Sequence, residues 1–460
     1  MMRRPGAPWR SRDGGDVGRK IGLPTATALV VGNMIGSGIF LLPSSLAPYG
    51  ATSIVGWVLT AGGSLGLALV FARLARLVPK VGGVYAYTRE AYGDFPGFWI
   101  AWGYWISQWT GNAAISVAFS SYLSVFVPAL RGRPAVSAAV AAAAVWVLTA
   151  VNLRGVRSAG NVQVVTTILK LLPLVAIGTV GLLWLQPSRF VPFNPSGEPT
   201  WSAITTVATL TLWSFLGLES ATVPADDVRD PARTIARATV IGTAVSAAVY
   251  VASTVAVMGA MPREALQGSE APFAEAARAM WGSWAYYAVG LGAVVSCFGA
   301  LNGWLLLVGQ VAMAAAQDGL FPRRFAARSS RGVPAFATVV GSLLITALLA
   351  LYATGARSLQ AVFHGIILLA VLSALIPYAF CALAPLLIGR ARGHAIAVRD
   401  LVLCGGAFAY AVWATYGAGA QTVMYGLLLL LAGIPVYVWM RRERTLSETG
   451  APPDRASTAG

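Results

Sequence analysis

Residues 30–43 read VVGNMIGSGIFLLP, an apolar stretch interrupted near its middle by Gly36 and Gly38. A second apolar stretch, TLWSFLGLESATVP at 211–224, is also interrupted by a glycine. Glycine lowers helix propensity by about 1 kcal/mol relative to alanine, and it lets a ligand approach the bare backbone. In a membrane chain, such interrupted segments at matching positions of two halves point to a binding site at the bilayer midplane. We therefore expect the first and sixth spans to be discontinuous helices.

The composition around these stretches indicates that lipid is the solvent. Of 460 residues, 57% are hydrophobic and 11% are charged. A soluble fold of this size cannot hide so much apolar surface. A membrane helix needs about 20 mostly apolar residues, and such runs recur along nearly the whole chain. They predict an all-α membrane protein with twelve transmembrane helices, at about 22–48, 51–78, 97–127, 135–153, 161–185, 201–225, 236–260, 283–316, 335–354, 359–388, 401–418 and 421–440.

The twelve spans suggest two related halves and an added pair. Five helices per half would make the second half run through the membrane in the opposite sense, which is a five-plus-five inverted repeat. The expected parts are a tail at 1–20, a first repeat at 21–190, a second repeat at 191–389, helices eleven and twelve at 390–445, and a tail at 446–460. Pro272 to Met280, between spans seven and eight, is expected to form a short amphipathic helix.

The net charge of +16 is distributed unevenly. Most of the 33 Lys and Arg residues fall on the side of both termini, and the positive-inside rule places that side in the cytoplasm. The charge therefore indicates topology, and we expect no nucleic-acid partner. The excess of Arg over Lys is typical of a GC-rich bacterial source, hence a multi-pass protein of the cytoplasmic (inner) membrane. No small-residue cleavage site follows the first apolar run, so a cleaved signal peptide is not expected.

The sequence holds few residue patterns that would indicate a metal site or a catalytic site. The three Cys residues lie in apolar segments, and the two His residues, His364 and His394, have no companions at ligand spacing. No Ser/His or paired-carboxylate arrangement is expected at membrane depth. We expect no metal, no cofactor and no enzyme activity.

The glycines of span one predict a site for an α-amino acid. If the helix unwinds there, the amides of Ser37 and Gly38 begin a new half-helix that suits a carboxylate. Carbonyls left unpaired around Asn33 to Ile35 would accept an ammonium. Helix packing through Gly32 and Gly36 is the alternative explanation. The substrate-binding residues expected in this segment are Met34, Ile35, Gly36, Ser37 and Gly38.

Two ionisable residues lie deep within predicted spans. Glu219 is the only carboxylate and Lys170, in VQVVTTILKLLPL, is the only base. Intramembrane charges usually face a cavity, a partner or a proton path. We expect Glu219 to gate and to sense protonation, and Lys170 to pair with an acid or to bind carbonyls of span one. The alternative is that both residues reach the membrane interface.

Several further side chains lie beside these candidates. Tyr104, Gln108 and Asn112 follow one another at intervals of four, on one helical face. Trp213 precedes Glu219 by six residues, and Trp304 lies between glycines in GALNGWLLLVGQ, where its ring could hold a cation. Packing is the alternative for each of them.

Three longer segments resemble a known family. GNMIGSGIFLLPSSLAPYG at 32–50, TLWSFLGLESATVPADDVRDPARTIARAT at 211–239 and GWLLLVGQVAMAAAQDGLFP at 303–322 are similar to the amino acid–polyamine–organocation transporter superfamily. Within it they most resemble the basic amino acid/polyamine antiporters, the arginine/agmatine exchanger group. The likeness runs from about residue 21 to 440, and it implies the five-plus-five inverted repeat.

The resemblance also implies roles for site residues. Met34, Ser37 and Gly38 match the family's contacts with the substrate's α-carboxylate and amine. Trp213 matches a gating tryptophan, whose carbonyl would bind the amine together with that of Leu216.

Other matched positions concern the gates and the substrate side chain. Glu219 matches the inner gate acid and Tyr104 the outer gate tyrosine. Asn112 and Trp304 match residues that hold a guanidinium by hydrogen bonding and stacking.

The sequence also departs from that group. Gln108 and Ser107 stand where the group carries smaller or softer residues, and Lys170 resembles the span-five lysine of proton-coupled, sodium-independent permeases.

The leading hypothesis is a secondary active transporter that exchanges a cationic amino acid for a related amine or polyamine by alternating access. The alternative is a proton-coupled or facilitated permease for neutral amino acids. Partners are the amino acid or polyamine substrate and the lipid bilayer, and a homodimer is compatible with the sequence.

Overall fold

The computed structural model describes residues 21–79, 82–154, 170–222, 228–355 and 358–449, and over these ranges the regular structure is helical. The helices are α1 (Leu23–Met34), α2 (Ser37–Leu46), α3 (Thr52–Leu77), α4 (Val84–Tyr92), α5 (Asp94–Leu123), α6 (Pro134–Leu153), α8 (Thr200–Leu212), α9 (Pro231–Ala260), α10 (Arg263–Gln267), α11 (Pro272–Trp281), α12 (Ser283–Gln317), α13 (Ala335–Gly355), α14 (Leu359–Ala391), α15 (Val398–Gly417), α16 (Ala420–Leu431) and α17 (Gly433–Thr449). The predicted short helix at 272–280 is confirmed as α11.

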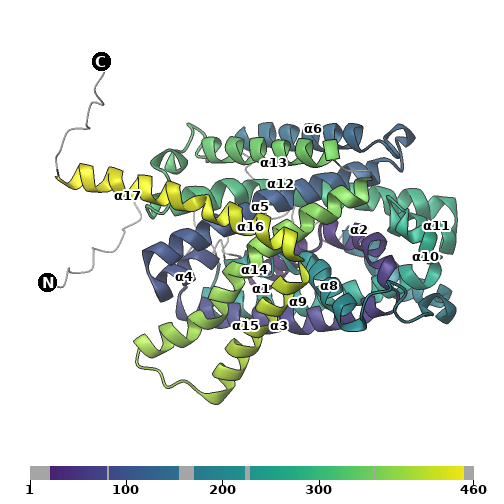
Figure 1. Cartoon of the computed structure of the whole chain (residues 1–460), viewed down its shortest axis with the longest axis horizontal. Helices are drawn as coiled ribbons and strands as arrows, with labels where there is room; N and C mark the ends of the chain where they lie inside the picture. The colour runs from purple at the N-terminus through teal and green to yellow at the C-terminus, as the bar shows by residue number, and fades with distance from the viewer. Residues whose placement is uncertain (1–20, 80–81, 155–169, 223–227, 356–357, 450–460) are drawn as a thin grey trace.

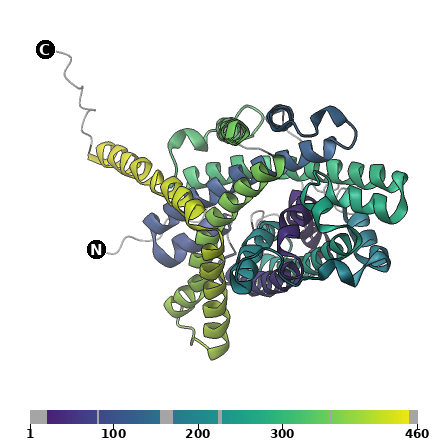
Figure 2. The ribbon, with the colours of Figure 1, turned by 45° about the vertical axis from the view of Figure 1, so that its right-hand side comes forward.

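The short helices α1, α2 and α8 lie among longer ones. In Figure 1, α6 and α13 run side by side over α5 and α12, and the two broken segments lie deeper, beside α9 and α14. Figure 2 shows the ribbon after rotation, with the N-terminal purple helices near the middle of the bundle. α5 and α2 carry many of the side chains that are fully buried, including polar ones such as Thr110, Asn112 and Ser116. Part of the buried polar surface therefore lies on α5, which contacts α2.

Among the described residues, seven helices are long and apolar enough to cross a membrane, and two shorter apolar helices cover 170–184 and 335–351. The all-helical membrane class is thereby confirmed. The count of twelve spans, the inverted repeat and the orientation of the termini stay predictions, and residues 161–169 of the predicted fifth span lie outside the described ranges. α5 is not among the seven because its Ser, Thr, Gln and Asn residues lower its hydropathy.

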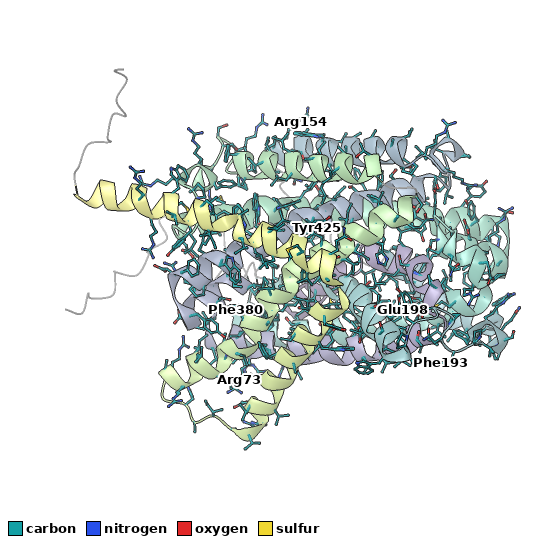
Figure 3. All side chains as sticks on the ribbon, viewed as in Figure 1. Arg73, Arg154, Phe193, Glu198, Phe380 and Tyr425 are labelled. Atoms are coloured by element: carbon teal, nitrogen blue, oxygen red, sulfur yellow. The ribbon has the colours of Figure 1, made fainter. Side chains whose placement is uncertain are left out.

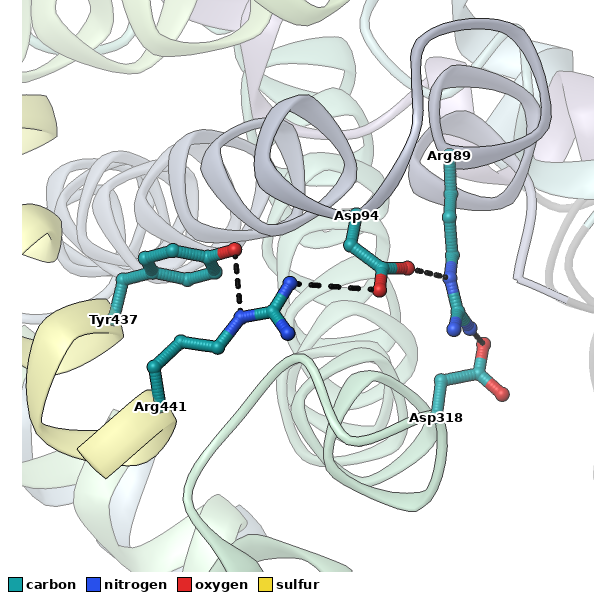
Figure 4. A network of polar contacts seen from close by, with 5 residues as sticks. All are labelled: Arg89, Asp94, Asp318, Tyr437 and Arg441. Carbon is teal, nitrogen blue, oxygen red and sulfur yellow. Dashed lines mark hydrogen bonds and ion pairs between the residues drawn. The ribbon is translucent and has the colours of Figure 1, made fainter. Parts of the chain in front are cut away.

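A charge network joins helices at the end of the bundle that is rich in basic residues (Figure 4). The Nε of Arg89 donates to Asp94 at 2.9 Å, and the Arg89 guanidinium also lies 3.5 Å from Asp318. Asp94 lies 3.7 Å from Arg441, whose Nε donates to the Tyr437 hydroxyl at 3.0 Å. These groups are partly exposed, so each pair contributes modestly, but together they connect α4, α5, α17 and the end of α12.

Close helix packing in the bundle generates a stability prediction. A Cβ at Gly56 of α3 would lie 2.2 Å from a methyl carbon of Val207 on α8, whereas a Cβ at Gly62 of the same helix would meet nothing within 4 Å. Gly56→Ala is expected to lower the free energy of unfolding by about 1–3 kcal/mol, the usual cost of overpacking. Gly62→Ala is the matched control and should keep or raise stability. Thermal unfolding in detergent measures both, and equal melting temperatures would contradict the prediction.

Candidate functional site

The first helix is interrupted where the sequence predicts. α1 ends at Met34, and α2 begins at Ser37. In a continuous α-helix the amide of Gly36 would bond the carbonyl of Gly32, but it bonds the carbonyl of Met34 instead, at 3.0 Å. The carbonyls of Gly32 and Asn33 therefore lose their helical partners, and the first amides of α2 have no side-chain cap.

The second interrupted segment has a different local form. α8 ends at Leu212 and continues as a single 3₁₀ turn, Trp213–Phe215. Leu216 is extended, and Gly217 has φ +100°, a backbone conformation that residues other than glycine rarely adopt. A Cβ at Gly217 would also lie 2.9 Å from the ring of Trp304 and 3.4 Å from the backbone of Asn33. The glycine thus permits both the turn and the close approach of the two breaks.

A small pocket, with a cavity volume of about 30 Å³, lies between the two breaks. Its walls come from the breaks and from α5, α12 and α14. It is lined by Asn33, Met34, Gly36, Ser37, Gly38, Tyr104, Ser107, Gln108, Gly111, Ile115, Trp213, Leu216, Glu219, Trp304, Ala374 and Tyr378. Of the predicted substrate-binding residues, Ile35 and Asn112 do not line it. Both are fully buried, and the Asn112 amide nitrogen donates to the carbonyl of Gln108 within α5, at 2.9 Å.

Side chains from other elements bind the freed carbonyls. The indole nitrogen of Trp304 donates to the carbonyl of Asn33 at 3.2 Å. The ammonium of Lys170 donates to the carbonyl of Gly32. The sequence predicted either an acidic partner for Lys170 or a contact with carbonyls of span one, and the structure shows the second. The Tyr250 hydroxyl donates to the carbonyl of Ser214 at 2.9 Å. Each break is therefore held open by hydrogen bonds.

Glu219 is buried between two tyrosines. The Tyr104 hydroxyl, from α5, donates to one carboxylate oxygen at 2.5 Å, and the Tyr378 hydroxyl, from α14, donates to the other at 2.6 Å. Tyr104 and Glu219 are thus in direct contact, and their assignment to an outer and an inner gate stays a prediction. Tyr378 is a site residue that the sequence motifs did not predict. Its only signal in the sequence is a tyrosine beside Pro377 in an otherwise apolar run.

The amino acid permease family model matches residues 21–442. The chain belongs to the amino acid permease family. A cadaverine/lysine antiporter of Escherichia coli (strain K12) is 37% identical over 72% of this permease and 75% of its own length. Two putrescine transporters, both named PotE, are 34% identical (Haemophilus influenzae) and 32% identical (Escherichia coli strain K12); both alignments cover 91% of this chain, and 96% and 95% of the relatives.

The permease therefore groups with the basic amino acid/polyamine antiporters, as the sequence motifs indicated. The family and these relatives are transporters, not enzymes. Together with the apolar helices, this makes the protein a multi-pass membrane transporter of bacterial type.

The closest approach between the two breaks generates a site prediction. A Cβ at Gly38 would lie 2.6 Å from the Ser214 hydroxyl and 2.9 Å from the Trp213 ring. Gly38→Ala in this permease is expected to displace one of them and weaken substrate binding by about 1–3 kcal/mol. Gly299→Ala on α12 is the control, because its Cβ would meet nothing within 4 Å. Substrate-induced thermal stabilisation measures both variants, and unchanged stabilisation of Gly38→Ala would remove Gly38 from the site.

Proposed function

We propose that this permease exchanges a cationic amino acid for a related amine or polyamine by alternating access. The observation that carries the proposal is the pocket between two helix breaks, with Trp304 on one wall and the Glu219 carboxylate on another. The names of the relatives support the same substrate class, since they refer to cadaverine, lysine and putrescine. Lysine and cadaverine differ by a carboxylate, so one pocket must accept an amine with or without it.

The proposed binding mode uses the first break for the substrate's α-carbon end. The uncapped amides of Ser37 and Gly38 would bind a carboxylate at the positive end of α2. The carbonyls of Trp213 and Leu216, with Met34 and Gly36 opposite, would accept the α-ammonium. Because a diamine lacks the carboxylate, it would leave the α2 amides to water.

The rest of the pocket would hold the distal ammonium. Trp304 offers a ring face for a cation–π contact, and Gln108, which is 2% exposed, offers an amide oxygen from α5. We expect Asn112 to act through the α5 backbone, since its amide bonds the carbonyl of Gln108.

The proposed gate comprises Glu219, Tyr104 and Tyr378, with Trp213 beside it. The two phenolic hydrogen bonds join the second break to α5 and α14. Opening the pocket on that side requires both bonds to break, which exposes the carboxylate to water and to protons. Glu219 would thus combine the gating and coupling roles.

A second function is favoured by one contact. The buried ammonium of Lys170 binds the first break at the Gly32 carbonyl, a position from which loss of its proton would loosen α1. Proton-coupled uptake of a neutral amino acid would follow from such a link.

Counterflow in proteoliposomes distinguishes the two functions. Labelled lysine should enter vesicles that contain cadaverine or putrescine, and should not enter empty vesicles, because exchange requires a bound substrate in each direction. Vesicles without protein provide the background. Equal uptake into empty vesicles would contradict exchange, and neutral amino acid uptake that an imposed pH gradient drives would favour the second function.

Glu219→Gln tests the gate. The amide keeps the shape of the carboxylate but cannot ionise, so the exchange rate should vary less with pH than in the unmodified permease. The control is Glu264→Gln on α10, an exposed carboxylate outside the pocket. An undiminished pH dependence in Glu219→Gln would exclude Glu219 as the titrating group.

A further inference from the structure

A second cavity lies on the outside of the bundle, between α3, α9 and α15. Its cavity volume is about 400 Å³, and it shares no residue with the central pocket. Its apolar walls include Leu69 of α3, Ile241 of α9 and Leu403 of α15. Leu69 and Ile241 are 45% and 44% exposed, so this groove opens to the surroundings of the protein, which at membrane depth are lipid chains.

One end of the groove is basic. Arg73 and Arg76 of α3, with Arg237 of α9, line it together with the apolar residues. Leu69, Arg73 and Arg76 follow one another at intervals of four and three, so they share one face of α3. α3 ends at Leu77, whereas α9 begins at Pro231 and α15 begins at Val398. The three arginines therefore lie at the same end of these helices.

The arginines differ in their partners. Arg73 forms a salt bridge with Asp400 of α15, a carboxylate that is 5% exposed (Arg73 is labelled beside α15 in Figure 3). Arg76 and Arg237 are exposed, and across the described residues neither has a salt bridge or a side-chain hydrogen bond. The groove thus carries two positive charges that the described part of the chain does not neutralise.

The order of charges and apolar groups matches an amphiphile. Leu69 is seven residues from Arg76, about 10 Å along the helix axis. A phosphate at Arg76 and Arg237 would therefore leave acyl chains alongside Leu69, Ile241 and Leu403. Basic pockets between helices at the cytoplasmic side are suited to anionic lipid head groups, and the basic end of the groove is on the predicted cytoplasmic side.

We propose that this groove binds an anionic phospholipid, with the head-group phosphate between Arg76 and Arg237 and an acyl chain along α3, α9 and α15. The lipid would fill the space between α15 and the α3–α9 pair, beside the Arg73–Asp400 salt bridge. This site is separate from substrate binding, so its test does not depend on the transported solute.

The experiment measures lipid binding to the full chain. The purified protein is placed in phosphatidylcholine nanodiscs with a small fraction of phosphatidylglycerol, and native mass spectrometry counts the phosphatidylglycerol retained as that fraction rises. The double variant Arg76→Gln/Arg237→Gln should bind phosphatidylglycerol about thirtyfold more weakly, from the attraction that two basic residues exert on an anionic lipid. The single variants should each show part of the loss, and they replace the double variant if it does not fold.

The matched control is Arg323→Gln/Arg324→Gln, which removes two exposed arginines from the same side but outside the groove. It should retain the lipid. Equal loss in both double variants would mean diffuse surface attraction and would overturn the proposal. Soluble glycerol phosphate provides a further test, because it has the phosphate but no acyl chains. If it displaces phosphatidylglycerol from the unmodified protein, the site binds a free anion without using the apolar walls, and the proposal is overturned.

Discussion

The structure depends on one constraint, which is that backbone groups exposed by a helix break find no partner in lipid, so they must bond other protein groups or face a water-filled cavity. The breaks after Met34 and Leu212 release carbonyls that continuous helices would occupy. Side chains from other parts of the bundle bind these carbonyls, namely Lys170, Trp304 and Tyr250. The surrounding helices are therefore required for the breaks to exist, and the pocket exists because the breaks do.

The buried carboxylate of Glu219 also needs hydrogen-bond partners, as the exposed backbone groups do. A buried carboxylate is costly unless its oxygens accept hydrogen bonds, and here each oxygen accepts one from a tyrosine. These tyrosines come from α5 and α14, so the carboxylate draws two long helices toward the second break. One acidic group thus fixes the position of three elements around the pocket.

Much of this arrangement could be predicted from local signals. Gly36 and Gly38 in the first segment and the single Gly217 in the second predicted both breaks, since glycine is where a membrane helix most readily departs from regular winding. Proximity across the bundle was harder to predict. Tyr378 is far from Glu219 in sequence, and the contact between Tyr104 and Glu219 depends on how α5 crosses the second break. Asn112 follows Tyr104 and Gln108 at intervals of four on α5, which suggested that it faces the pocket, yet its amide nitrogen donates to the Gln108 carbonyl of its own helix.

The contact between Lys170 and Gly32 has a consequence for the ions that the protein needs. A dissolved cation at a carbonyl binds and leaves according to its concentration, whereas a lysine is covalently attached and its local concentration is constant. The positive charge that holds the end of α1 therefore does not depend on the sodium or potassium content of either compartment.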